Sequence, residues 1–201
     1  MSIKRALLIV DVQHDFCPGG ALPAEDGDAV VPVLNRTIEK FQAAGYPVVA
    51  SRDWHPEQSA HFQERGGPWP PHCIQGTTGA EFHKDLELPA DVVVITKGDD
   101  PDEDEGYSAF EGKTDDGKSL VETLHAEDIE EVFVGGLATD YCVRASALDA
   151  VKAGFRTHLI VDAVRGVDIN PGDSGHAIEE MKRDGVHITI SDQINFARSD
   201  E

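Results

Sequence analysis

Residues 132–161, VFVGGLATDYCVRASALDAVKAGFRTHLIV, decide the fold of this chain. The segment opens with the apolar run Val132–Val134, passes through a helical pattern over Asp140–Ala153, and returns to an apolar run at His158–Val161. Gly154, directly after the helical pattern, is typical of a helix C-cap. Two strands joined by one helix lie parallel, because the helix carries the chain back across the sheet. The segment therefore predicts one βαβ unit.

The same alternation extends over the whole chain, and it predicts an α/β fold. We expect a three-layer, doubly wound sheet of about six mainly parallel strands with helices on both faces, in a single domain spanning residues 1–201. The expected strands are Ala6–Val10, Val48–Ala50, Val92–Thr96, Val132–Val134, His158–Val161 and His187–Ile190; the expected helices are Ala29–Ala44, Ser119–His125, Asp140–Ala153 and Ser174–Asp184.

Two stretches depart from this pattern. Residues 52–88 are rich in His, Pro, Gly and Trp and have little periodicity, which indicates a functional excursion from the fold. Residues 98–106, GDDPDEDEG, form an acidic run that we expect to be a solvated flap.

The charge of the chain excludes several classes of partner. It has 17 Lys and Arg against 38 Asp and Glu, and a formal net charge of −21. Nucleic acids and anionic membranes would be repelled, because phosphate contacts require clustered basic residues. At molar salt the Debye length is only about 3 Å, so the acidic surface is interpreted as a halophilic adaptation.

The N-terminus and the cysteines point to the cytoplasm. No signal-peptide pattern and no apolar run of about 18 residues is present. The cysteines Cys17, Cys73 and Cys142 are odd in number and lack paired spacing, as expected in a reducing compartment. We expect a small-molecule substrate as partner and leave a homo-oligomer open.

Reactive residues follow the predicted strands, where α/β sheets bind their ligands. Asp11, Asp53 and Lys97 come after the first three strands, and the fourth runs toward Cys142. A thiol in the first turn of a helix feels the positive end of the helix dipole, so we expect a lowered pKa for Cys142, with Thr139 or Asp140 as N-cap. An inert buried cysteine is the alternative.

These groups together predict a nucleophilic site. Lys97 would favour the thiolate of Cys142, and Asp11 would take the thiol proton and pass it to a leaving amine. The backbone N–H groups of Ala138 and Cys142 are candidates for an oxyanion hole.

A second group of residues predicts a metal site. Asp53 and His55 lie two residues apart, on the same side of an extended segment, and His61 and His72 follow. One carboxylate and up to three imidazoles suit Zn²⁺, with Fe²⁺ or Mn²⁺ as alternatives. Cys73 is interpreted as structural.

Five blocks of sequence carry a resemblance to a known family. The chain resembles the nicotinamidase/pyrazinamidase family of isochorismatase-like cysteine hydrolases over nearly its whole length. The blocks are DVQHDFCPGGAL (Asp11–Leu22), SRDWHP (Ser51–Pro56), GGPWPPHCIQGTTGAEFH (Gly66–His83), YSAFEG (Tyr107–Gly112) and GGLATDYCVRASALDAVKAG (Gly135–Gly154).

The resemblance implies a role for each matching residue. It implies a Cys-Asp-Lys triad at Cys142, Asp11 and Lys97, and a divalent metal, Zn²⁺ first, held by Asp53, His55 and His72. Some relatives use a further histidine at the position of His61, and others use water. The resemblance also implies a cis peptide bond between Leu137 and Ala138. The pocket residues it implies are Phe16, Trp69, Tyr107 and Leu137, with Tyr141 standing where relatives often have His.

The expected activity is hydrolysis of nicotinamide, and of pyrazinamide, to the acid and ammonia through a thioester, in NAD salvage. The alternative within the superfamily is another small amide, such as a carbamoyl or ureido compound. Isochorismate cleavage is disfavoured because it needs no nucleophilic thiol. A redox protein or a non-catalytic binder is disfavoured because no CxxC motif accompanies Cys142.

Overall fold

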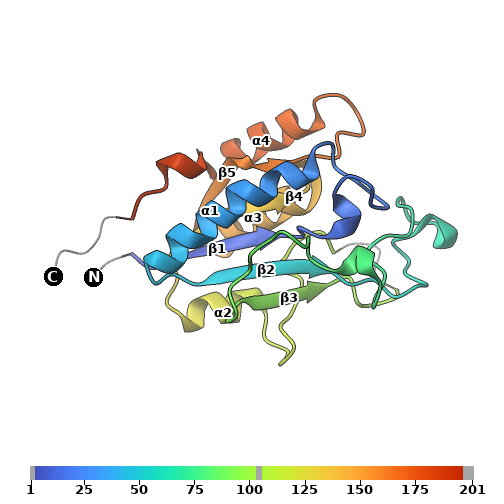
Figure 1. The fold of residues 1–201 in the computed structure, drawn as a ribbon, viewed down its shortest axis with the longest axis horizontal. Helices are drawn as coiled ribbons and strands as arrows, with labels where there is room; N and C mark the ends of the chain where they lie inside the picture. Colours follow the sequence, from blue (N-terminus) through green and yellow to red (C-terminus); the bar gives the residue numbers. More distant parts are fainter. Residues whose placement is uncertain (1–2, 103–105, 197–201) are drawn as a thin grey trace.

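A computed structural model describes residues 3–102 and 106–196 of the chain, and its centre is a parallel sheet (Figure 1). Six strands are hydrogen-bonded in the order β3-β2-β1-β4-β5-β6, and every pair is parallel. The strands are β1 (Arg5–Val10), β2 (Val48–Asp53), β3 (Val93–Lys97), β4 (Glu131–Leu137), β5 (Arg156–Arg165) and β6 (His187–Thr189). The fold class predicted from the sequence is confirmed.

The helices cover both faces of the sheet. They are α1 (Val30–Ala43), α2 (Leu120–Ala126), α3 (Arg144–Lys152) and α4 (Asp173–Arg183). Alternate residues of β1 supply the two cores: Leu7 packs in the cluster that holds the apolar side of α1, and Leu8 packs in the cluster that holds residues of α2, α3 and α4. Each core therefore follows from the two-residue period of a strand and the apolar stripe of the opposing helices.

The strand order places the crevice for a ligand. The chain begins at β1, adds β2 and β3 on one side, and returns to add β4 on the other side of β1. Such a reversal opens a crevice at the carboxyl ends of the two central strands. The site is therefore expected beyond Val10 and Leu137, where β1 and β4 end.

Several boundaries differ from the sequence prediction, and β4 gains Glu131 and the residues 135–137. β2 continues to Asp53, because its last residues pair with β3 as far as Lys97. β5 continues to Arg165, pairing again with β4 after a register shift between Val134 and Gly136. The helix expected from Asp140 starts as a π-helical turn over Thr139–Val143, and only then becomes α3.

The two irregular stretches are also described. The segment after β2 has two short 3₁₀ turns, Gln63–Arg65 and Thr78–Ala80, and otherwise runs as loops, as the sequence predicted. Residues 99–102 of the acidic stretch are exposed, and its residues 103–105 lie outside the described part. Among the described residues, no helix has the length and apolarity needed to cross a membrane.

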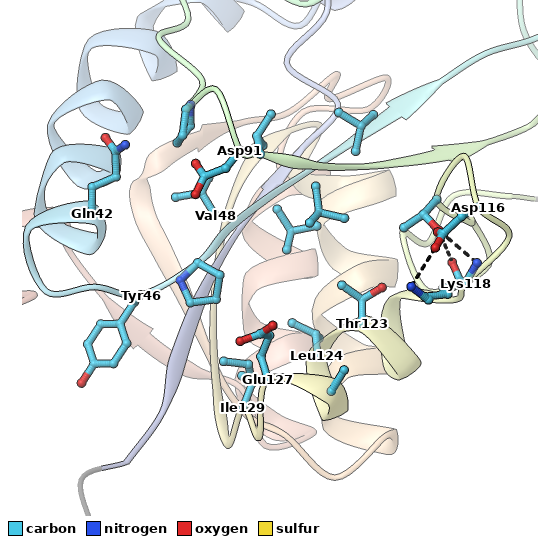
Figure 2. Close-up of a pocket in the computed structure, with 18 of the residues that line it drawn as sticks. Gln42, Tyr46, Val48, Asp91, Asp116, Lys118, Thr123, Leu124, Glu127 and Ile129 are labelled. Atoms are coloured by element: carbon cyan, nitrogen blue, oxygen red, sulfur yellow. Dashed lines mark hydrogen bonds and ion pairs between the residues drawn. The ribbon is translucent and has the colours of Figure 1, made fainter.

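A wide surface hollow of about 890 Å³ lies at the other end of the sheet (Figure 2). Val48 and Val93, at the amino ends of β2 and β3, line it together with Leu124 of α2, and Asp116 pairs with Lys118 at its rim. It lies away from the carboxyl ends of the strands and contains none of the reactive residues identified in the sequence.

Candidate active site and metal centre

Four reactive side chains meet at the carboxyl ends of four neighbouring strands. Asp11 follows β1, Asp53 ends β2, Lys97 ends β3 and Cys142 follows β4. Lys97 Nζ lies 2.8 Å from Asp11 Oδ2 and donates to Cys142 Sγ at 3.6 Å and to Asp53 Oδ1. All four residues are buried. The structure therefore brings together the residues that the sequence predicted for a nucleophilic site.

Lys97 is the central charge of this cluster. Burial alone would lower the pKa of its ammonium, but the carboxylates of Asp11 and Asp53 hold that pKa well above its usual value. Burial alone would raise the pKa of Asp53, yet the Lys97 ammonium holds it well below the usual range. Lys97 and Asp53 are therefore an ion pair at neutral pH.

Asp11 and Cys142 differ from that pair. Burial raises the pKa of Asp11 even though Lys97 opposes the shift. Burial also raises the pKa of the Cys142 thiol well above its usual value; Lys97 lowers it, and the nearby carboxylate of Asp11 adds to the rise. The expected lowering of the Cys142 pKa is therefore wrong for this structure, because desolvation outweighs the opposing effect of Lys97.

The turn that carries Cys142 is held by its backbone. The peptide bond between Leu137 and Ala138 is cis, as the resemblance implied. The Ala138 carbonyl accepts from the N–H groups of Tyr141 and Val143, both at 3.1 Å. Gly136 approaches β1 so closely that a Cβ there would lie 2.1 Å from the carbonyl oxygen of Val10.

No side chain caps this turn, so the predicted N-cap role of Thr139 or Asp140 is wrong. Ala138 occupies the N-cap position. The carboxylate of Asp140 instead accepts from the backbone N–H groups of Val167 and Asp168, at 3.0 and 2.8 Å. It thereby ties the turn of Cys142 to the loop after β5.

Three histidines gather beside Asp53. Ring nitrogens of His55, His61 and His72 lie within 4.8 Å of one another, and all three residues are buried. The Nε2 atoms of His55 and His72 lie 3.6 and 3.9 Å from Asp53 Oδ2. The four residues that the sequence proposed as metal ligands thus form one cluster.

The chemistry of this cluster fits a divalent metal. Nδ1 of His55 faces the carbonyl of Gly98 at 3.0 Å, and Nδ1 of His72 faces that of Pro70 at 2.8 Å. This arrangement fixes the tautomer that leaves Nε2 as the ligand atom. Nε2 of His55 is buried without a hydrogen-bond partner, and burial lowers the pKa of His72 to about 4, which keeps its imidazole neutral. Neutral imidazoles and a carboxylate are ligands that zinc binds.

A narrow cavity connects the two groups of residues. Trp69 Nε1 donates to the hydroxyl of Tyr107 at 2.9 Å, and the Trp69 ring stands edge-on to Tyr141 with centroids 4.8 Å apart. These three aromatic side chains form one wall. The residues that line the cavity are Leu22, Asp53, His61, Trp69, His72, Gly106, Tyr107, Tyr141, Cys142 and Val167.

Comparison with known proteins assigns the family. Residues 5–193 match the isochorismatase domain. The chain belongs to the isochorismatase family. It is 42% identical to the nicotinamidase of Escherichia coli, with 94% of this chain and 96% of the relative covered, and 40% identical to the nicotinamidase/pyrazinamidase of Mycobacterium tuberculosis, with 93% and 99% covered. A crystal structure of Pyrococcus horikoshii pyrazinamidase in complex with zinc superposes with a TM-score of 0.86 at 50% identity, covering 93% of this chain and 99% of that one.

Two of the pocket residues implied by the family resemblance lie behind the cavity wall. Phe16 is buried, with its ring 5.5 Å from that of His72, and Leu137 is fully buried in the core on the α1 side of the sheet. Neither residue is among those that line the cavity, whereas Trp69, Tyr107 and Tyr141 are.

The structure of this isochorismatase-family site adds residues that the sequence analysis missed. Ser51 donates to Asp11 Oδ1 at 2.6 Å, and the carbonyl of Gly106 accepts from Lys97 Nζ at 3.1 Å. A Cβ on Gly98 would lie 2.5 Å from the His55 ring. Leu22 and Val167 reach the cavity from loops distant in sequence, so no local pattern marks them.

Proposed function

We propose that this chain is a nicotinamidase that hydrolyses nicotinamide, and also pyrazinamide, to the carboxylic acid and ammonia. The single observation that carries the proposal is the arrangement of one cavity, in which Cys142 lines the same narrow space as His61 and His72 of the histidine cluster. A planar ring held at the histidines would present its carboxamide to the thiol. The similarity to curated nicotinamidases over more than nine-tenths of the chain supports the same substrate.

The first half of the reaction forms a thioester. Asp11 accepts the thiol proton while Cys142 Sγ attacks the carboxamide carbon, which suits a thiol that is neutral at rest and a carboxyl whose pKa burial has raised. The C–S bond forms, and the carbonyl electrons move onto oxygen. The backbone N–H groups of Ala138 and Cys142 stabilise that oxyanion. Asp11 returns the proton to the amine, the C–N bond breaks, and ammonia leaves.

The second half releases the acid. Asp11 takes a proton from a water molecule as the water attacks the thioester carbon. The C–S bond then breaks, and Cys142 recovers its proton from Asp11. Lys97, 3.6 Å from Cys142 Sγ, stabilises the negative charge that passes through the sulfur and keeps Asp11 oriented.

The metal ligands in this proposal are Asp53, His55 and His72, with His61 as the fourth. A divalent ion bound by these residues would supply Lewis-acid chemistry and a ligand position for the ring nitrogen of the substrate. We favour Zn²⁺ because neutral imidazoles and one carboxylate match its ligand preferences, and because a structure of similar fold is a zinc complex. Phe16, Leu137, Trp69, Tyr107 and Tyr141 shape the cavity around the ring.

A substrate comparison tests this proposal. We expect the purified, zinc-loaded protein to release ammonia from nicotinamide and pyrazinamide with a much higher kcat/KM than from a linear ureido compound. A higher kcat/KM for the ureido compound would assign the chain to the alternative activity. A cytoplasmic location and a role in NAD salvage stay predictions.

A further inference from the structure

The loop after β1 carries Gln13 and Asp15, two polar residues to which the reaction assigns no role. The opening motif Asp11-x-Gln13-x-Asp15-Phe16 supplies the base Asp11 and the buried Phe16, whose ring lies 5.5 Å from that of His72. Gln13 is fully buried, and Asp15 is half-buried. Buried polar side chains need partners, so the partners of these two show what the loop holds.

Gln13 holds the backbone of Asp53. Its Oε1 accepts from the N–H of Asp53 at 2.8 Å, and its Nε2 donates to the carbonyl of Asp53, also at 2.8 Å. The same Nε2 donates to the carbonyl of Ala80 at 2.8 Å. One amide thus fixes both sides of the residue whose carboxylate faces His55, His72 and Lys97.

Asp15 holds the segment that carries His72. Its Oδ2 accepts from the N–H of Cys73 at 2.7 Å, and its Oδ1 accepts from the N–H of Ala21 at 3.1 Å. Cys73 has a φ of 46°, in the left-handed region where a non-glycine residue needs outside support. Position 79 must be glycine for Asp15 to make these contacts, because a Cβ there would clash with Asp15 Oδ2 at 2.2 Å.

We propose that Gln13 and Asp15 are positioning residues of the metal centre, and that they hold Asp53 and His72 at the separation a divalent ion requires. This inference rests on the metal centre of the proposed function. Ligand distances must match a metal within about 0.2 Å, so small backbone shifts at two ligands on different segments are costly. Because both residues lie on the loop of Asp11, that single loop fixes the catalytic base relative to the metal ligands Asp53 and His72.

The alternative is that the two side chains only stabilise the fold. Asn35 offers a matched control, since its side chain makes the same kind of clamp elsewhere: Nδ2 donates to the carbonyl of Asp85 at 2.8 Å, and Oδ1 accepts from the N–H of Glu87 at 3.0 Å. A purely structural role predicts that Gln13→Leu and Asn35→Leu lower the melting temperature of the metal-free protein and leave the zinc affinity of the folded protein unchanged.

The test measures the zinc Kd of the folded protein by competition with a chromophoric chelator. The set comprises wild type, Gln13→Leu, Asp15→Asn, Asp15→Ala and Asn35→Leu, each with its metal-free melting temperature. Residues that hold metal ligands typically contribute 10- to 100-fold in affinity. We expect a Kd about 10- to 100-fold weaker for Gln13→Leu and Asp15→Ala, a smaller loss for Asp15→Asn, which keeps one acceptor oxygen, and wild-type affinity for Asn35→Leu.

Each outcome decides between the two roles. A zinc Kd within twofold of wild type in both Gln13→Leu and Asp15→Ala would overturn this inference and leave the proposed metal centre unaffected. If Gln13→Leu does not fold, the Asp15→Ala result decides by the same criterion. Wild-type protein that binds no zinc would overturn the metal centre, and this inference with it.

Discussion

Lys97→Met removes the ammonium that lies between the buried carboxylates of Asp11 and Asp53, and the cost of this substitution follows from burial. The side chains of Lys97 and Asp11 are 1% and 0% exposed, and their charged atoms lie 2.8 Å apart. Removing one member of such a buried pair costs about 3–5 kcal/mol of unfolding free energy, because the remaining charge is left without compensation. For a chain of this size, that loss corresponds to a melting temperature lower by about 6–20 °C.

The surface pair Lys118–Asp116 provides the control. Its charged atoms are 2.7 Å apart, nearly the same separation, but its side chains are 62% and 60% exposed. Solvent screens such a pair, so Lys118→Met should leave the melting temperature unchanged. Both substitutions remove a lysine charge from a close ion pair, and the pair of Lys97 is buried whereas that of Lys118 is exposed.

The pH dependence gives a second readout for Lys97→Met. Without the ammonium, the folded-state pKa values of Asp11 and Asp53 rise, because burial is no longer opposed by a positive charge. A carboxyl whose folded pKa is raised destabilises the fold while it is ionised. The stability deficit should therefore shrink as the pH falls from neutral toward the ordinary carboxyl pKa of about 4.

Differential scanning calorimetry of the metal-free proteins, at one fixed salt concentration between pH 5 and pH 8, measures both effects. Metal must be absent, since a bound cation would replace part of the lost charge. An unchanged melting temperature for Lys97→Met at pH 7, or an equal loss for Lys118→Met, would refute the reasoning.

Further substitutions and salt give additional predictions. Cys142→Ala should abolish turnover and keep the fold, whereas Cys17→Ala should retain turnover. Single-turnover rates near wild type for Cys142→Ala would exclude thiol catalysis. Metal analysis should find that His72→Ala no longer binds one metal ion per chain and that His61→Ala loses less metal. Full metal stoichiometry in His72→Ala would show that His72 is not a ligand. With a net charge of −21, the melting temperature should rise markedly from low to molar KCl while turnover per folded molecule changes much less; a flat or falling melting temperature would contradict a salt adaptation.

The layers of the fold could be predicted because strand and helix leave different periods in the sequence. The apolar run before Asp11 and the amphipathic pattern before Gly45 both correspond to observed elements, β1 and α1. The ends of the strands were harder to predict from sequence, since they depend on pairing with the neighbouring strand. The continuation of β2 to Asp53 reflects its pairing with Lys97, which lies far away in the sequence.

The site residues at strand ends could be predicted from sequence. The contacts made between loops were harder to predict. Asp11, Lys97 and Cys142 each follow or end a strand, so the topology brings them together. The pKa of Cys142 could not be inferred from its position near a helix start, because its burial is a property of the whole site. Gln13 was marked only by its place in the motif, and its partners, Asp53 and Ala80, are known only from the folded chain.

Ammonia release from nicotinamide directly tests whether this chain is a metal-dependent cysteine amidohydrolase. Wild type and Cys142→Ala are assayed side by side after chelation and again after zinc is restored. We predict turnover in the zinc-restored wild type, little turnover after chelation, and none in Cys142→Ala under either condition. Ammonia release by folded Cys142→Ala at the wild-type rate, or none from the zinc-restored wild type, would contradict this assignment.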